Sequence, residues 1–227
     1  MLVTKAKSFR KHPLFNNINL DYLVKSVFTD YGDSWKRQRQ LVQPSFSDDN
    51  LANILVDHMH FISHKLSEKL WELKDENNTI NIGNIMSRTT LEVIARAGFG
   101  LSDLDIIGGT DGRFATLAGS VIQVLSAGLV FNRRVIEPVT KLLFPDKFKQ
   151  VFVEWPNLLR SAVSKREHEI ELEKESGEVY KSNLLSNMLL SKVEDDSVKN
   201  KSFSLEVVAN THIFLLAGTY HKVQHRF

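Results

Sequence analysis

The apolar residues of this chain recur mostly at steps of three and four, which is the periodicity of helices that bury one face. The clearest run is entered through the capping residues Ser47, Asp48 and Asp49 and ends at the turn-forming stretch 75–78. One long amphipathic helix is predicted between them. Its apolar positions are Leu51, Ile54, Leu55, Met59, Ile62, Leu66, Leu70 and Leu73.

The same periodicity predicts further helices. A helix over 82–97, ended by Gly98 and Gly100, precedes a glycine-containing loop over 102–113 and an apolar helix over 114–129. The inner face of the helix over 82–97 is predicted to consist of Ile82, Ile85, Met86, Val93, Ile94 and Ala97.

The second half of the chain is also helical in pattern. A long helix over 147–174 contains Pro156, where a helix start or a kink is expected because proline lacks a backbone donor. A short helix follows over 184–193. The last helix is predicted to begin at Ser204, with Glu206 in its first turn near the positive end of the helix dipole.

This last helix is apolar up to Gly218, and a helix that apolar belongs at the centre of a packed body. No strand-like stretch is longer than 79–82. The fold class predicted from the pattern is therefore mainly α.

The composition narrows function by exclusion. Lys plus Arg total 29 and Asp plus Glu total 27, and no basic stripe is visible, so nucleic-acid binding is not expected. No apolar stretch is long enough for a signal peptide or a transmembrane segment. The 227 residues include no cysteine, which excludes disulfides, thiolate metal sites and cysteine nucleophiles among them.

Three histidines lie close together on the long helix. His60 and His64 are four residues apart and could share a metal ion, and His58 is nearby. No glutamate or third ligand completes a site at the usual spacing. Solvated histidines, and no metal site, are the prediction.

Two segments carry candidate chemistry. Trp35 and Arg39 are four apart on a short helix that Pro44 closes, and an indole beside a guanidinium is a donor-only pair suited to a carboxylate. A surface cation–π contact is the alternative interpretation. Ala217 and Gly218 form a small step that lets a flat ligand approach the last helix, unless Gly218 simply ends that helix.

The order of these segments resembles the cytochrome P-450 family, the heme-thiolate monooxygenases. The resemblance runs from the family's B helix to the middle of its I helix and covers residues 1–219. It rests on the ordered set of Trp35 and Arg39, the stretch 91–100 (Leu-Glu-Val-Ile-Ala-Arg-Ala-Gly-Phe-Gly), and the stretch 204–218 that ends in Ala-Gly.

The resemblance implies roles for these residues. Trp35 and Arg39 match the positions that hold a heme propionate, and Ala217 and Gly218 match the step that passes over the heme face and leaves room for dioxygen. The region 11–31 is similar to the loop that covers the substrate pocket, and 114–144 to the roof around the F helix. The implied cofactor is heme, and the implied partners are an NADPH-dependent reductase and a small hydrophobic organic substrate.

The sequence departs from the family pattern after Gly218. The family's acid and threonine positions are Tyr220 and His221 here, so no catalytic residue is predicted. Residues 220–227 are unlike the family and are interpreted as an aberrant tail. The Glu-x-x-Arg motif and the cysteine that ligates the iron are both missing from the sequence.

We therefore expect a partial P-450-type helical fold, helices B to I, without the N-terminal sheet or the C-terminal heme-ligand region. Such a truncated chain is expected to be inactive alone, with His212 or His221 as conceivable adventitious heme ligands. The alternative hypothesis is a cofactor-free helical interaction module that binds a reductase or a full-length relative. Eukaryotic relatives usually sit on the endoplasmic reticulum through an N-terminal helix. No such helix is expected in this sequence, so both the endoplasmic reticulum and the cytoplasm are kept as locations.

Overall fold

The computed structural model describes residues 26–75, 80–109, 112–131, 133–177, 183–194 and 201–220. Within these residues the chain is helical and contains no strand, which confirms the mainly α prediction. The elements are α1 (Gly32–Val42), η3 (Gln43–Phe46), α2 (Asp48–Asp75), α3 (Ile82–Phe99), α4 (Gly112–Val130), α5 (Arg133–Leu143), α6 (Pro145–Lys149), η4 (Gln150–Glu154), α7 (Trp155–Ser176), α8 (Leu184–Glu194) and α9 (Lys201–Tyr220).

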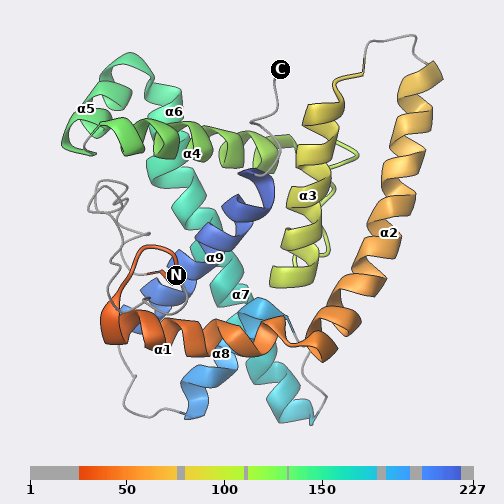
Figure 1. Cartoon of the computed structure of the whole chain (residues 1–227), viewed down its shortest axis with the longest axis vertical. Coiled ribbons are helices and arrows are strands. Elements are labelled where there is room, and N and C mark those ends of the chain that lie inside the picture. Colours follow the sequence, from red (N-terminus) through yellow and green to blue (C-terminus); the bar gives the residue numbers. More distant parts are fainter. Residues whose placement is uncertain are drawn as a thin grey trace, which may run out of the picture.

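Helix α9 lies in the middle of the molecule (Figure 1). It packs on α3, α4, α7 and α8, whereas the long helix α2 lies at one edge and packs on α3. No described helix has both the length and the apolar character that a membrane crossing requires.

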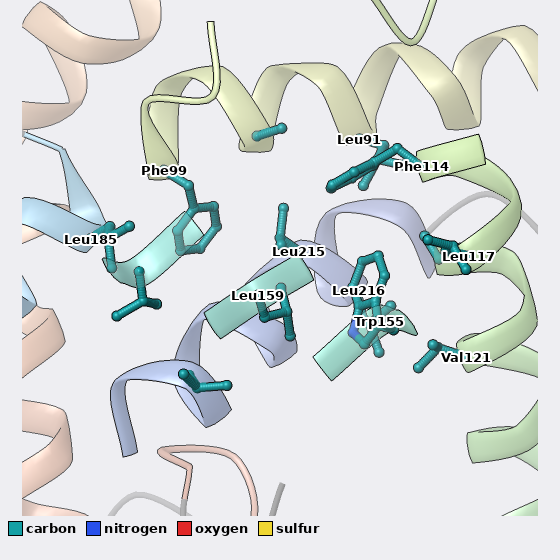
Figure 2. Close-up of a cluster of buried hydrophobic side chains, with 14 of the residues drawn as sticks. Leu91, Phe99, Phe114, Leu117, Val121, Trp155, Leu159, Leu185, Leu215 and Leu216 are labelled. Carbon is teal, nitrogen blue, oxygen red and sulfur yellow. The ribbon is translucent and has the colours of Figure 1, made fainter. Parts of the chain in front are cut away.

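The core forms where α9 meets its neighbours (Figure 2). Leu215 and Leu216 of α9 lie near Trp155 and Leu159 of α7, and all four side chains are buried. Side chains from α3, α4 and α8 complete the cluster, including Leu91, Phe99, Phe114, Leu117, Val121 and Leu185. The predicted central position of the last helix is thereby confirmed.

Helix α2 and the helix that follows η4 agree with the sequence pattern. The predicted entry of α2 at its aspartates is observed, since the helix begins at Asp48 and ends at Asp75. Pro156 is the second residue of α7, directly after the π-helical turn η4. Because α7 begins at Trp155, the helix start expected at Pro156 is observed.

The predicted inner face of α3 is right at Ala97, which is buried, and at Ile94, which packs against the core, but it is wrong at the start of the helix and omits Glu92. Ile82 is 54% exposed, and the buried side chains are Leu91, Glu92, Ala95, Ala97 and Phe99, with Thr89 at the edge. Gly98 lies inside the helix, and Gly100 ends it with a φ of 66°. The pattern misled because it placed Val93 inside and the neighbouring Glu92 outside, whereas Glu92 is fully buried.

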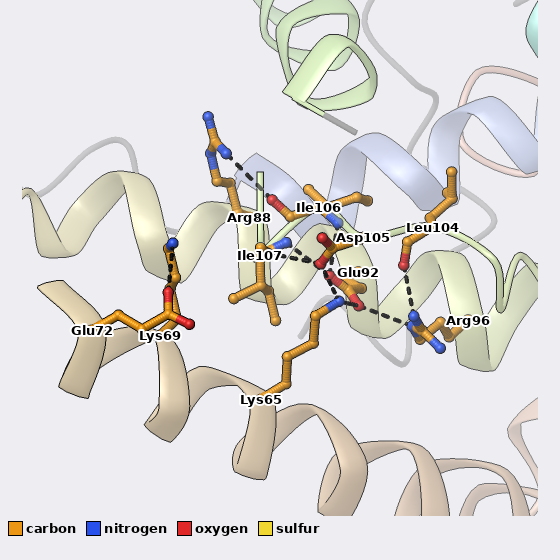
Figure 3. A network of polar contacts seen from close by, with 11 residues as sticks. Lys65, Lys69, Glu72, Arg88, Glu92, Arg96, Leu104, Asp105, Ile106 and Ile107 are labelled. Carbon is orange, nitrogen blue, oxygen red and sulfur yellow. Dashed lines mark hydrogen bonds and ion pairs between the residues drawn. The ribbon is translucent and has the colours of Figure 1, made fainter. Parts of the chain in front are cut away.

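Glu92 is buried because its carboxylate is surrounded by donors (Figure 3). One oxygen, Oε1, pairs with Lys65 Nζ of α2 at 2.6 Å and with Arg96 Nε of α3 at 3.0 Å. The other, Oε2, accepts the backbone N–H groups of Ile106 at 2.9 Å and Ile107 at 2.8 Å. The carboxylate thus joins α2, α3 and the loop that leads to α4.

Replacement of Glu92 by alanine should therefore destabilise the chain severely. It would leave the backbone N–H groups of Ile106 and Ile107 without their carboxylate acceptor. It would also break the ion pairs to Lys65 and Arg96, which would keep Asp105 and the backbone oxygen of Leu104 as partners. Breaking such a buried pair costs about 3–5 kcal/mol. The free energy of unfolding in urea at neutral pH measures this loss. The control is Glu72→Ala, which removes the exposed partner of Lys69 and should cost no more than about 0.5–1 kcal/mol. Equal losses in the two variants would show that Glu92 is not the joint we describe.

Candidate functional site

Helix α1 presents the two donor side chains that the sequence singled out. The guanidinium carbon of Arg39 lies 5.4 Å from the centre of the Trp35 ring, so the predicted shared face is observed. Trp35 is half-buried and Arg39 is exposed. Pro44 lies in η3, directly after α1, which ends at Val42. The pair is a cation–π contact, and its guanidinium remains accessible to an anion.

Between Glu206 and Ala217, helix α9 has a partly exposed stripe, here called the open stripe. From Glu206 to Leu216 its side chains are buried except for Ile213 and Phe214, which are half-buried, and Ala217 beyond them is exposed. Phe214 packs on Phe46, with ring centres 5.6 Å apart. The stripe is apolar and ends in a small residue, as a contact surface for a flat apolar ligand would.

Gly218 does not end this helix. Helix α9 continues through Gly218 to Tyr220, so the small Ala-Gly step lies within helical backbone. The interpretation of Gly218 as a helix terminator is therefore wrong. His221 and the rest of the tail, and most of the region 11–31, lie outside the described residues.

Two contacts that sequence reasoning missed join α1 to α9. Arg37 Nη2 pairs with Glu206 Oε1, and Glu206 is almost completely buried. Asn210 Nδ2 donates to Gln38 Oε1 at 2.8 Å, again between buried side chains. The structure thus gathers Trp35 with Arg39 on α1, and Ala217 with Gly218 on α9, and other residues of the same two helices hold the helices together.

The predicted role of Glu206 is corrected by these contacts. Helix α9 begins at Lys201 rather than Ser204, so Glu206 lies beyond the first turn and its charge is matched by Arg37. A signal was present in the sequence: Glu206 and Asn210 are polar residues four apart within an apolar helix, on one face. Such a pair indicates a polar contact with a neighbouring element.

His212 faces away from the open stripe. It is fully buried, and its Nδ1 accepts a hydrogen bond of 2.6 Å from Trp155 Nε1 of α7. Burial lowers the pKa of His212 from 6.5 to about 3, so the ring is neutral, with the proton on Nε2. Because His212 points into the α7 contact, it is not placed to ligate a heme on the stripe, contrary to the possibility raised by its position in the sequence.

His60 and His64 of α2 line a shallow surface hollow of about 500 Å³ together with Phe61, Lys65 and Glu68. His64 Nδ1 lies 3.4 Å from Glu68 Oε1. Among the described residues no three His, Asp or Glu side chains gather as a metal site would require.

Comparison with known proteins identifies the family of this chain. The cytochrome P-450 family model matches residues 1–221. The chain belongs to the cytochrome P-450 family. It is 21% identical to cytochrome P-450 94A1 of Vicia sativa and 23% identical to cytochrome P-450 6d3 of Musca domestica, each over 96% of this chain. A cytokinin hydroxylase of Arabidopsis thaliana is 29% identical over 87% of the chain.

The chain spans less than half of these relatives: 41% of the Vicia protein, 45% of the Musca protein and 36% of the Arabidopsis protein. The family is one of heme-dependent monooxygenases, and its cofactor is heme. The matched part includes α1 with its Trp35–Arg39 pair and the whole of α9.

The buried imidazole of His212 should make stability depend on pH. Its pKa is lower in the folded chain than in the unfolded chain, so stability is greatest above pH 6.5 and falls as the unfolded state takes up a proton, down to about pH 3. Between pH 7 and pH 5 His212 alone should remove about 2 kcal/mol from the free energy of unfolding.

The variant His212→Asn keeps an acceptor near Trp155 and removes the titration. Urea unfolding at both pH values should show a smaller loss in this variant than in the wild type, while His60→Gln, at an exposed position, should keep the wild-type loss. An unchanged pH dependence in His212→Asn would contradict a neutral buried imidazole.

Proposed function

We propose that this chain is the part of a heme monooxygenase that contacts one edge and one face of the heme. One observation carries the proposal. The Trp35–Arg39 pair is accessible on α1, and an ion pair joins α1 to α9, the helix that carries the open stripe of Ile213, Phe214 and Ala217. Arg39 and Trp35 would hold a propionate. Ala217 and Gly218 would pass over the heme face.

The chemistry of these residues fits that ligand. An indole N–H and a guanidinium only donate hydrogen bonds, and a propionate carboxylate only accepts them. The apolar stripe on α9 suits the flat face of a porphyrin, and the small side chain of Ala217 leaves room above it. The fit does not extend to the axial ligand, because the 227 residues contain no cysteine.

Heme with a thiolate ligand activates dioxygen for insertion of one oxygen atom into an organic substrate, with electrons from a reductase. The residues of this chain would bind the propionate, orient the porphyrin and shield one face from water. The family's acid and threonine positions are Tyr220 and His221, so we assign no residue to proton delivery. These 227 residues alone are therefore proposed to be inactive as a monooxygenase.

The remaining assignments belong to the proposal as well. An NADPH-dependent reductase would supply electrons, and the substrate would be a small hydrophobic organic molecule. Residues 1–219 would form the partial P-450 domain and 220–227 the aberrant tail, a boundary close to residue 221, where the family match ends.

Hemin titration of the purified chain tests the proposal. The wild type should bind hemin saturably, and Arg39→Ala should weaken binding about tenfold or more, since a hydrogen bond to a charged group contributes about 1.5–3 kcal/mol. The Soret absorbance measures both affinities. Arg160→Ala, which removes an exposed arginine from α7, should bind as the wild type does.

The reduced hemin complex with carbon monoxide should lack a thiolate-type spectrum, because no cysteine is present. A thiolate-type spectrum, or hemin binding that is insensitive to Arg39, would contradict the proposal.

A further inference from the structure

Two polar links hold one side of α1 against α9. In the first, Arg37 pairs with Glu206. In the second, Gln38 accepts from Asn210 through its carbonyl oxygen and donates through its amide nitrogen to Asp30 Oδ2 at 3.2 Å. We call these four side chains, Arg37, Gln38, Glu206 and Asn210, the α1–α9 clamp.

Three of the four clamp side chains are buried, so the clamp restrains how α1 can move on α9. Gln38, Glu206 and Asn210 are each at most 1% exposed. Asn210 uses both ends of its amide, because Nδ2 also donates to Glu206 O at 3.0 Å and Oδ1 accepts from Val27 N at 2.8 Å. A buried amide bonded at both ends allows little rotation or sliding, since any shift leaves a buried polar atom without a partner.

The charge of Glu206 depends on the same helix. Within the described part of the chain, Glu206 Oε2 has no hydrogen-bond partner, so the ion pair through Oε1 carries the compensation of a buried charge. Arg37 is still 39% exposed, so one end of the ion pair is in contact with solvent while the other is buried. Separating the ion pair would leave the buried Glu206 carboxylate without a counter-charge, which costs free energy.

The donor pair lies on a different side of α1. A helix turns by about 100° per residue, so Trp35 and Arg39 lie within about 40° of each other. Both are more than 100° round the axis from the midpoint between Arg37 and Gln38. The clamp therefore grips α1 without covering the Trp35–Arg39 pair, and it fixes the direction in which that pair points.

Along α9, the clamp lies close to the open stripe. Ala217 follows Asn210 by seven residues, which is about 10 Å along the helix axis. The same four side chains thus relate the donor pair of α1 to the open stripe of α9. Binding groups need to be held within about 0.5 Å and 10–20° to act together.

We propose that Arg37, Gln38, Glu206 and Asn210 are positioning residues of the heme site, which set the rotation and register of α1 on α9 and thereby aim Trp35 and Arg39 at the propionate. The inference rests on the proposed function. None of the four needs to touch the heme, because they act through Trp35 and Arg39.

The test compares hemin with hemin dimethyl ester, whose propionates carry no charge. The wild type should bind hemin about tenfold or more tightly than the ester, and Arg39→Ala should reduce this ratio to about twofold or less. If the clamp aims Arg39, its variants should lose the ratio as well. A variant that only loosens the fold would weaken binding of both porphyrins and keep the ratio.

Two clamp variants with opposite changes of charge separate positioning from attraction at a distance. Arg37→Gln removes a positive charge and Glu206→Gln removes a negative charge, so simple attraction would shift their affinities for hemin in opposite directions. Positioning predicts that both lower the ratio to about threefold or less. Lys36→Gln, which removes an exposed positive charge from the same helix, should keep the ratio within about twofold of the wild type.

The outcomes are distinguishable. A wild-type chain without saturable hemin binding, or without preference for hemin over the ester, overturns the proposed function and this inference with it. A ratio that Arg39→Ala lowers but that Arg37→Gln and Glu206→Gln leave intact overturns the inference alone. Should Glu206→Gln fail to fold, as judged by circular dichroism, Gln38→Met replaces it, because it breaks the second link at nearly constant length and with no change of charge.

Discussion

The ion pair between Arg37 and Glu206 ties the central helix to the helix that carries the candidate site. The carboxylate of Glu206 on α9 is buried, and a buried charge is tolerated only with a partner. The partner comes from α1, 169 residues earlier in the sequence. The same two helices are joined again where Asn210 donates to Gln38, and α1 also packs on α8. The Trp35–Arg39 pair and the open stripe of α9 then have a defined relation, which no local interaction could provide.

The chain buries a second carboxylate, Glu92, in a different way. Glu92 is bonded by two cations and two backbone N–H groups, so both of its oxygens are satisfied. Glu206 has an ion pair on one oxygen only. The first arrangement is a rigid joint between α2, α3 and the following loop. The second is more sensitive to the position of a single guanidinium, which suits a contact that sets the aim of a helix rather than one that only holds the core.

Helices were predictable here wherever one face is apolar. Asp48 and Asp75 bound α2 as the capping pattern indicated, and the helix start at Pro156 followed from its missing donor. The face of α3 was not predictable, because a glutamate is assigned to the surface unless its partners are known, and those of Glu92 come from other elements. The Trp35–Arg39 contact is local, at a spacing of four, and could be read directly. The Arg37–Glu206 pair is a tertiary contact, so the sequence showed only its trace in the polar pair Glu206 and Asn210.

The absence of cysteine bears on reactivity and leaves the architecture unaffected. The contacts described between α9 and the start of the chain are made by side chains of this chain: the Arg37–Glu206 ion pair and the Gln38–Asn210 hydrogen bond from α1, and the packing of Phe46 of η3 on Phe214. None of them requires iron or its axial ligand. The surfaces proposed to meet the porphyrin can therefore form before any cofactor binds, and a thiolate supplied elsewhere would complete the chemistry without rebuilding this wall. Family membership and catalytic competence are thus separable properties, and the match over residues 1–221 shows the first alone.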